Sequence, residues 1–456
     1  MKKVLLTIVL SCVGIFPALA NEGSVNHLNM TNSALGIAAL LVFLLAYILV
    51  IAEEFIHLRK SKPVILAAGI IWIFTALLAR GSDKNQALLE HSLNHNLLEY
   101  AALLLFLLTS MIYVNAMTNR NVFEALRSWL IKSGFSYRKL FWITGVIAFF
   151  ISPVVNNLTT AFLMGAVVLA VGSDKPKFVT LAFINIVIAS NAGGAFSPFG
   201  DITTLMVWQS GNVNFFDFFK LFIPAVVNFL VPAFILSRSV SSKTPEPSSE
   251  VVKLKQGGLI ICFLFIATII TSVTFEQLLH LPPFLGMMMG LSYLFFYAYY
   301  LERCAKKSNK GIDEFNIFNE VARAEWDTLL FFFGVIFCVG GLGTIGYLAD
   351  VSKILYDGLG ATNANIIAGL LSAIVDNIPV MFAILTMNPD MDTFQWLLVA
   401  MSAGVGGSLL SVGSAAGVAL MGQSKGIYSF FSHLKWSWAI AIGYALSIYV
   451  HFLING

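Results

Sequence analysis

The chain has 456 residues, of which 58% are hydrophobic and only 11% are charged. A soluble domain carries about 25% charged residues, so most of this surface is expected to face membrane lipids. The net charge of +3 is too small to indicate nucleic-acid binding, and no basic, aromatic-rich patch supports it. The four cysteines are scattered without a CxxC pair, which argues against a disulfide framework.

The first 20 residues have the form of a secretory signal. Lys2 and Lys3 precede an apolar run, and Ala18-Leu-Ala20 fits the small-x-small cleavage rule. We expect a signal peptide over residues 1–20 that is cleaved after Ala20, with an uncleaved first helix as the alternative. Such a signal is typical of a bacterial inner-membrane protein whose mature N-terminus lies outside the cytoplasm.

Eight apolar segments of about 20 residues are long enough to span a bilayer as helices. They cover residues 33–52, 63–80, 97–117, 219–237, 257–275, 282–301, 327–348 and 436–453. Residues 140–208 and 361–421 instead hold short apolar arms separated by polar or glycine-rich breaks. Arms of roughly 11–16 residues reach about 17–24 Å, less than the ~30 Å hydrocarbon core. We therefore expect re-entrant hairpins or broken helices.

The distribution of Lys and Arg decides between these paths, because cytoplasmic loops carry the excess of basic residues. With hairpins over 140–171 and 361–387 and broken crossings over 178–208 and 394–421, the inside segments hold 21 basic residues and the outside segments three. A full crossing over 140–171 would invert everything that follows. The sequence thus predicts an all-α polytopic membrane protein of about ten full crossings, with two re-entrant hairpins and two broken transmembrane helices.

The two unusual regions resemble each other. Ser152-Pro-Val-Val-Asn-Asn-Leu158 matches Ser372-Ala-Ile-Val-Asp-Asn-Ile378, and the segment from Gly193 to Asp201 matches the one from Gly406 to Ser414. Glycine pairs recur by chance in membrane proteins, but two motifs in order at nearly one offset favour a true repeat. Because the predicted hairpins enter from opposite sides, this is an inverted-topology repeat, as in many secondary transporters.

The repeat divides the mature chain into two halves joined by a polar, Pro- and Ser-rich linker. The expected parts are N-terminal transmembrane helices (21–135), a first repeat core (136–238), a cytoplasmic linker (239–256), transmembrane helices of the second half (257–348), and a second repeat core with the last helix (349–456).

Four breaks, at 152–160, 190–204, 372–379 and 404–414, interrupt the helices of the repeat. Lipid cannot satisfy the freed backbone groups, so such a break must be buried in protein or line a wet cavity. The breaks contain no Lys, Arg or His, but they do contain Asn156, Asn157, Thr159, Thr160, Asn191, Ser197, Asp201, Thr203, Thr204, Asp376, Asn377, Ser408, Ser411 and Ser414. These oxygens suit a hard cation such as Na⁺. An anion would favour an Arg clamp or helix N-termini without nearby carboxylates.

Asp201 and Asp376 are the strongest candidates in the breaks. A charge near the bilayer centre costs at least ~2.5–3.5 kcal/mol, and an asparagine would cap a broken helix without that cost. Burial favours a protonated carboxyl and a bound cation favours a carboxylate, so protons and Na⁺ can compete for one site. For the Asn, Ser and Thr side chains, capping the broken helices is the alternative to ion binding.

Other polar clusters are weaker candidates. Glu325 and Asp327 lie where a span starts, which suits a helix N-terminus, although Asp327 could contribute to a proton path. His91, His95 and Glu99 share a helix face. A metal site there is the alternative to an amphipathic start of the third span, but the HExxH frame is missing. Glu53, Glu54 and His57 end the first span beside Arg59 and Lys60, and we interpret these three residues mostly as interfacial anchors.

The chain lacks the signatures of an ATP-driven pump or a common enzyme. No GxSxG elbow, Walker sequence or dinucleotide fingerprint occurs. We therefore expect no enzyme activity and no cofactor, and we expect any uphill transport to be driven by an ion gradient. A channel is an alternative that the sequence leaves open.

The four breaks carry motifs of a known family. SPVVNNLTTAFLMG (152–165), SNAGGAFSPFGDITTLMVWQSG (190–211), SAIVDNIPVMFAIL (372–385) and GGSLLSVGSAAGVALMG (406–422) resemble the NhaD-type sodium/proton antiporters. These belong to the ion transporter superfamily, which includes arsenite permeases and dicarboxylate carriers. The SNAGGAFSPFGDITT run is specific to the NhaD type, and the resemblance covers nearly the whole mature chain.

The resemblance implies exchange of Na⁺, often also Li⁺, for H⁺ at the inner membrane, in pH and sodium homeostasis. It implies Na⁺ ligation by Asp376, Asn377, Asp201 and Asn157, and it also points to Asn191, Thr203, Thr204, Ser411, Ser414 and Asp327. Family members usually carry Asp-Asn in the first hairpin, where this chain has Asn156-Asn157. A dicarboxylate or arsenite carrier of the same fold is the alternative, and a homodimer is expected because homologues of this fold are often dimers.

Overall fold

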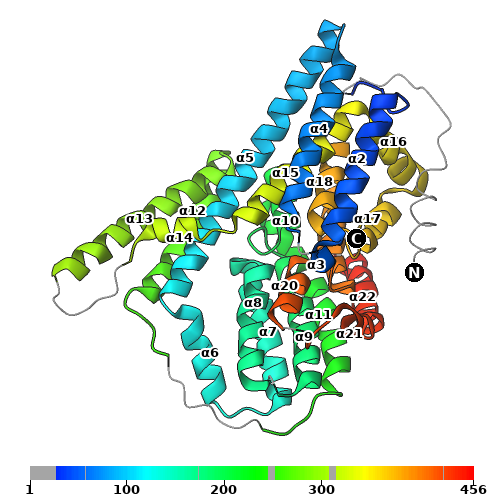
Figure 1. The fold of residues 1–456 in the computed structure, drawn as a ribbon. Coiled ribbons are helices and arrows are strands. Elements are labelled where there is room, and N and C mark those ends of the chain that lie inside the picture. The colour runs from blue at the N-terminus through cyan, green and yellow to red at the C-terminus, as the bar shows by residue number, and fades with distance from the viewer. Residues whose placement is uncertain (1–26, 57, 173, 245–251, 308–314, 425) are drawn as a thin grey trace.

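The computed structural model describes residues 27–56, 58–172, 174–244, 252–307, 315–424 and 426–456, and these residues form helices but no strands (Figure 1). The predicted signal peptide lies outside the described residues. Within them, ten helices are long and apolar enough to cross a membrane. They are α2 (Ala34–Ile51), α4 (Ser61–Ala79), α5 (Asp83–Asn119), α7 (Tyr137–Val155), α9 (Pro176–Gly194), α11 (Phe222–Ser237) with the preceding η1 (Phe215–Leu221), α12 (Gly258–Leu279), α13 (Pro283–Lys307), α15 (Trp326–Ile345) and α22 (Ser437–Asn455). The protein is an all-α polytopic membrane protein.

Eight of these ten helices coincide with the eight predicted uninterrupted spans, and α5 is the one that differs most. It begins at Asp83, well before the predicted start at residue 97, with Ser82 as its N-cap. Its 37 residues correspond to about 55 Å, far more than a bilayer core. The connection between α4 and α5 consequently forms the top of the molecule in Figure 1.

The first repeat core consists of α7, α8 (Asn157–Gly172), α9 and α10 (Ile202–Gln209), and the second consists of α17 (Ala361–Leu371), α18 (Asn377–Met387), α19 (Thr393–Gly406) and α20 (Ala415–Gln423). Helices α8, α17 and α18 have 16, 11 and 11 residues, as short as predicted. The re-entrant paths of the hairpins and their opposite orientations stay predictions.

Helix α7 is longer than the predicted arm over 140–151. It has 19 residues, because Ser136 caps it upstream and it continues through Pro153 to Val155. A helical proline leaves the carbonyl four residues earlier without its usual donor. That carbonyl, of Phe149, faces Gly193 of α9 so closely that a Cβ on the glycine would lie 2.2 Å from the oxygen.

The two repeat copies make the same internal contacts. Ser152 donates a hydrogen bond of 2.6 Å to the carbonyl of Ser190, and Ser372 donates one of 2.7 Å to the carbonyl of Ala403. Ser372 lies 220 residues after Ser152, the offset between the first pair of motifs, and Ala403 lies 213 residues after Ser190, the offset between the second pair. Each serine thus ties the tip of a hairpin to the end of the first half of a broken helix.

Glycines repeat these contacts in the second copy. Gly406, the counterpart of Gly193, faces the carbonyl of Gly369, and a Cβ there would lie 2.0 Å from the oxygen. A Cβ on Gly200 would lie 2.9 Å from the carbonyl oxygen of Ser152, and one on its counterpart Gly413 would lie 2.6 Å from that of Ala373, so both positions favour glycine. The sequence similarity between the copies therefore has a packing origin.

The second half of each broken helix packs against the other repeat copy. Helix α10 of the first copy packs on α18 and α19 of the second, and α20 of the second packs on α8 and α9 of the first. The central α9 is 89% buried along its most apolar window, whereas α2 and α12 are 22% and 28% buried. The breaks therefore meet at the centre of the molecule.

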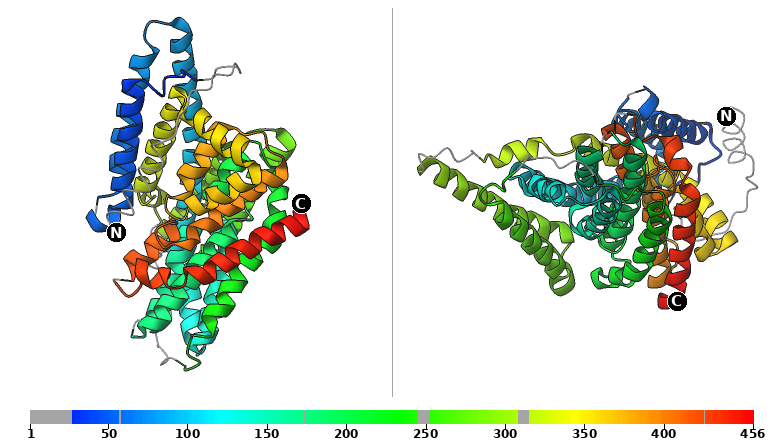
Figure 2. Two further views of the ribbon diagram at one scale, coloured as in Figure 1. Left: turned by 90° about the vertical axis from the view of Figure 1, so that its right-hand side faces the viewer. Right: turned by 90° about the horizontal axis from the view of Figure 1, so that it is seen from below.

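The other helices surround this centre. Helix α4 packs on α2 and α15, α11 packs on α22, and α12 and α13 pair and project from one side of the bundle when it is seen from below in Figure 2. The remaining described elements are α3 (Glu53–Ile56), α6 (Val122–Lys132), α14 (Ile317–Ala322), α16 (Tyr347–Ser352), the π-helical η2 (Lys353–Asp357), the 3-10 segment η3 (Gly407–Leu409) and α21 (Phe430–Leu434).

Candidate ion-binding site

A buried carboxylate joins the two repeat copies. Asp201 is the N-cap of α10, and one of its oxygens accepts a hydrogen bond from the backbone N–H of Thr203. The side-chain amide of Asn377, at the tip of the second hairpin, lies 3.3 and 3.5 Å from the two Asp201 carboxylate oxygens. Asp201 and Asn377 are 4% and 5% exposed. The first copy thus supplies the carboxylate, and the second copy supplies the amide that holds it.

A glycine leaves room beside this carboxylate. A Cβ on Gly404 of α19 would lie 2.9 Å from Asp201 Oδ2 and 3.3 Å from Thr203 Oγ1. These two oxygens therefore face the same point of the second broken helix. The Thr203 hydroxyl is buried and has no hydrogen-bond partner among the described residues. An unpaired buried oxygen beside a carboxylate is available to a cation.

A second polar chain crosses the centre. Asn157, at the tip of the first hairpin, donates a 3.1 Å hydrogen bond to Asn191 Oδ1 of α9. Asn191 in turn donates a 2.8 Å bond to the hydroxyl of Ser408 in the second break. All three side chains are buried. The predicted ligands Asn157 and Asn191 thus lie together and link the first hairpin to both broken helices.

The two hairpin tips differ at the position where their sequences differ in charge. Asn156 has a positive φ of 71°, and its side chain accepts a 2.9 Å hydrogen bond from the backbone N–H of Thr159. Asn156 is therefore a cap of α8, which is the alternative to ion binding. Its counterpart Asp376 makes no capping bond to the described part of α18. The Asp376 carboxylate is left for another role.

Asp376 pairs with a lysine from the first half of the chain. Lys60 Nζ lies 3.3 Å from Asp376 Oδ2 and 4.3 Å from the ring centroid of Phe331. Lys60 was not among the residues predicted for the site. No local pattern indicates this pair, because its partners are 316 residues apart and meet only through helix packing. The other oxygen, Asp376 Oδ1, is buried without a hydrogen-bond partner among the described residues.

The remaining predicted residues divide into two kinds. Thr204 donates 2.8 Å hydrogen bonds to the carbonyls of Ser197 and Asp201, and Ser414 caps α20 through Gly417. These two organise the breaks. The Ser411 hydroxyl, by contrast, is buried and unpaired within the described chain, like that of Thr203. Asp327 lies apart from the breaks, at the start of α15, where it accepts a hydrogen bond from Ser61.

A cavity of about 600 Å³ reaches the site from one side. Among the residues that line it are Lys60, Asn156, Asn157, Glu325, Asp327, Asp376 and Ser414. Its walls include the segments before α4 and α15, which the distribution of Lys and Arg places in the cytoplasm. Asp376 is therefore accessible from the side predicted to be cytoplasmic.

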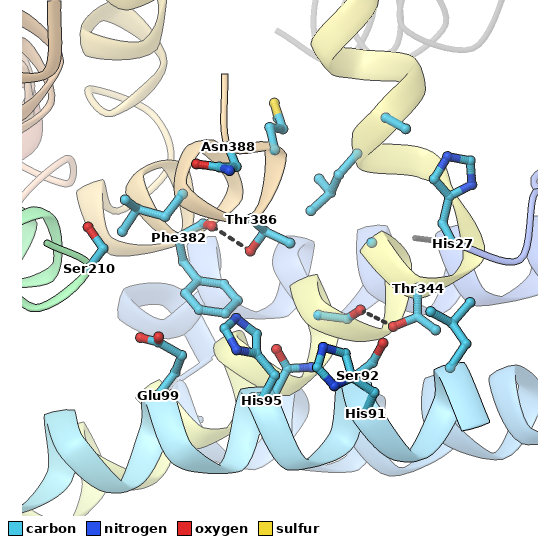
Figure 3. Close-up of a pocket in the computed structure, with 18 of the residues that line it drawn as sticks. His27, His91, Ser92, His95, Glu99, Ser210, Thr344, Phe382, Thr386 and Asn388 are labelled. Carbon is cyan, nitrogen blue, oxygen red and sulfur yellow. Dashed lines mark hydrogen bonds between the residues drawn. The ribbon is translucent and has the colours of Figure 1, made fainter. Parts of the chain in front are cut away.

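A second cavity, of about 660 Å³, opens between α5, α15 and α18 (Figure 3). His91, His95 and Glu99 of α5 point into it, toward Phe382 and Thr386. None of the predicted ion ligands in the described chain lines this cavity. Nor do the described residues contain a group of three or more His, Cys, Asp or Glu side chains placed to hold a metal ion. The histidines therefore line a cavity on the predicted outer side, away from the carboxylates.

Membrane-embedded carboxylates at the interface between two repeat copies, reached by a cavity from one side, are the arrangement of an ion-coupled secondary transporter. The comparisons agree with this class. A family described as "Citrate transporter" matches residues 27–406. The chain is also similar to proteins named Na(+)/H(+) antiporter NhaD.

One of these proteins, from Vibrio cholerae serotype O1, is 52% identical over 96% of this chain and 96% of its own length. Another, from Alkalimonas amylolytica, is 52% identical over 94% of this chain and 92% of its own length. Sodium/proton antiporter 1 of Arabidopsis thaliana is 29% identical over 96% of this chain and 76% of its own length. The chain belongs to the NhaD-type family, as its motifs predicted.

Proposed function

We propose that this protein is a secondary active antiporter that exchanges Na⁺ for H⁺ across the bacterial inner membrane. The observation that carries the proposal is the buried Asp201 carboxylate, held by Asn377 between the two repeat copies. A second carboxylate, that of Asp376, directly precedes Asn377 in the sequence. The names of the 51–55% identical relatives support the same activity.

The ligands of Na⁺ in this proposal are the two carboxylates and the buried hydroxyl oxygens of the breaks that have no hydrogen-bond partner. Thr203 Oγ1, Ser411 Oγ and Asp376 Oδ1 are buried without hydrogen-bond partners in the described chain. Hard monovalent cations take such carboxylate and hydroxyl oxygens in place of water. Asn377 and Asn157 hold the carboxylate and the hairpin tips in place, and Thr204 and Ser414 fix the start of each second half-helix.

Coupling follows from competition at the carboxylates. A carboxyl group that holds a proton cannot hold Na⁺ equally well, so binding of one ion releases the other. When Lys60 and Asp376 form their ion pair, their charges neutralise each other, and the Asp201 carboxylate supplies the remaining charge of the site. This single negative charge attracts a cation or a proton in preference to an anion.

The anion carrier is the weaker alternative. The family description names citrate, and an anionic substrate needs positive groups at the site. The lysine that the structure brings there, Lys60, already faces Asp376. The remaining negative charge at the site, that of Asp201, would repel a di- or tricarboxylate. Li⁺ as a second cation and a homodimer as the assembly complete the proposal, and both rest on the family resemblance.

The test is a proton-release assay in everted membrane vesicles that contain the protein. The vesicles are energised to acidify their lumen, and Na⁺, Li⁺, K⁺ or citrate is added between pH 6 and 9.5. We expect Na⁺ and Li⁺ to release lumenal protons, most strongly at alkaline pH, where protons compete least for the carboxylates. Absence of cation-induced proton movement at every pH would overturn the proposal, and proton movement with citrate alone would favour the anion carrier.

A further inference from the structure

We propose that the Lys60 ammonium is a built-in competitor of the transported cation: it binds the ionised Asp376 carboxylate when Na⁺ does not, and Na⁺ must displace it. The inference rests on the proposed function and adds a residue that sets the affinity for Na⁺. Lys60 lies outside every motif of the repeat, in the loop that leads into α4.

The ammonium has two partners at the site. It lies 3.3 Å from Asp376 Oδ2 and 4.3 Å from the centroid of the Phe331 ring. The side chains of Lys60 and Asp376 are 20% and 14% exposed, so water and salt screen this pair much less than a surface pair. The position over an aromatic face adds a further attraction for a cation. Lys60 thus forms a specific pair and not a loose surface contact.

The pair lies in the path of an arriving ion. Lys60 and Asp376 line the same cavity, and this cavity opens to the predicted cytoplasmic side. An ion that enters from that side reaches Asp376 where the ammonium now lies. Asp376 Oδ1 is buried and unpaired within the described chain, so it is the oxygen of this carboxylate that remains free while Lys60 holds Oδ2. Because Na⁺ and the ammonium repel each other, full ligation by both oxygens requires that Lys60 withdraw.

The cavity also offers the lysine another place to go. Glu325 and Asp327, at the start of α15, line the same cavity as Lys60. A flexible lysine stem lets the ammonium move from Asp376 toward these carboxylates without a change in the helices. When Na⁺ binds, the Lys60 ammonium thus exchanges Asp376 for another carboxylate and is not left as an unpaired charge.

The consequence is a higher Na⁺ threshold on the cytoplasmic side. Removing the competing charge should lower the Na⁺ concentration that gives half-maximal proton release. We expect a decrease of about fivefold or more for Lys60→Met, since typical coupling between two ligands of one site is of that size or larger. Lys60→Arg keeps the charge and should retain a half-saturating concentration near that of the wild type.

Everted vesicles suit the test, because they expose the cytoplasmic face to the added Na⁺. The titration is made at pH 9.5, where protons compete least. The matched control is Lys62→Met, which removes an exposed lysine two residues away. An unchanged or increased half-saturating Na⁺ concentration in Lys60→Met, with the control equal to the wild type, would overturn the inference. Wild-type vesicles without any Na⁺-induced proton release would instead overturn the proposed function.

Loss of the lysine leaves Asp376 without its partner, so Lys60→Met can fail to accumulate in the membrane. Lys60→Gln retains a hydrogen-bond donor without the charge and serves as the second variant. Thermal unfolding of the purified protein is followed as Na⁺ is added. Stabilisation of Lys60→Gln at lower Na⁺ concentrations than the wild type supports the competition, whereas stabilisation at the same or higher concentrations contradicts it.

Discussion

At the scale of single residues, the two carboxylates carry the ion chemistry. Asp201→Asn keeps the shape of the side chain and an oxygen that can cap α10, but it removes the negative charge that Asn377 holds. We expect this variant, and likewise Asp376→Asn, to accumulate in the membrane and to lose Na⁺-dependent proton release. Asp174→Asn is the control, because Asp174 is exposed and pairs only with the neighbouring Lys175 in the described chain. Normal exchange in either variant would move the titrating role to another residue.

Asn156 differs from its twin Asp376, and its substitution should affect stability more than ion binding. Its side chain caps α8, and its backbone has a positive φ that asparagine tolerates better than most residues. Asn156→Ala should therefore lower the free energy of unfolding by at least ~1 kcal/mol, the usual cost of losing a cap. Thermal unfolding of the purified protein measures this effect. A stable variant with an altered Na⁺ affinity would show that Asn156 acts as a ligand instead.

At the scale of helices, glycines decide how closely the hairpins and broken helices approach. A Cβ on Gly193 or Gly406 would lie 2.2 or 2.0 Å from a backbone carbonyl oxygen of the adjacent hairpin. A backbone carbonyl within a helix cannot move far enough to make room for a Cβ. Gly193→Ala and Gly406→Ala should therefore separate the helices and reduce the amount of folded protein. Gly422→Ala is the control, because no described atom lies within 4 Å of a Cβ there. Size-exclusion chromatography of the detergent-solubilised variants gives the folded fraction, and wild-type behaviour of both would refute the packing role.

Gly404 should behave differently from the packing glycines, because a Cβ there meets the site itself. Its nearest neighbours would be Asp201 Oδ2 at 2.9 Å and Thr203 Oγ1 at 3.3 Å. Gly404→Ala should therefore fold but require several times more Na⁺ for half-maximal proton release in everted vesicles. Gly422→Ala again provides the reference value. A variant with an unchanged Na⁺ requirement would place the ion away from this corner of Asp201.

At the scale of the whole molecule, hydropathy predicted the spans well, because about 20 apolar residues are needed to cross the hydrocarbon core. The first part of α5 was missed since residues 83–96 mix polar and apolar side chains and carry no uniform hydropathy signal. The extent of α7 was missed because Pro153 does not end that helix. Local sequence cannot show that Phe149 and Gly193 make close contact there.

The candidate site was predictable to a similar degree. Charged and amide residues inside apolar segments indicated Asp201, Asp376 and Asn377, since their cost in a bilayer requires a function. The pairing of Asn377 with Asp201 and of Lys60 with Asp376 joins residues 176 and 316 positions apart. Such contacts depend on how α4 and the two repeat copies pack, and no motif in the chain encodes them locally.

The central claim is that Na⁺ and protons compete for Asp201 and Asp376. Its most direct test is to add Na⁺ to the purified protein in a weakly buffered solution and to measure the protons released. The account predicts acidification by the wild-type protein and none by the double variant Asp201→Asn/Asp376→Asn. Stabilisation of the wild-type protein by Na⁺ without proton release, or equal release by the double variant, would contradict it.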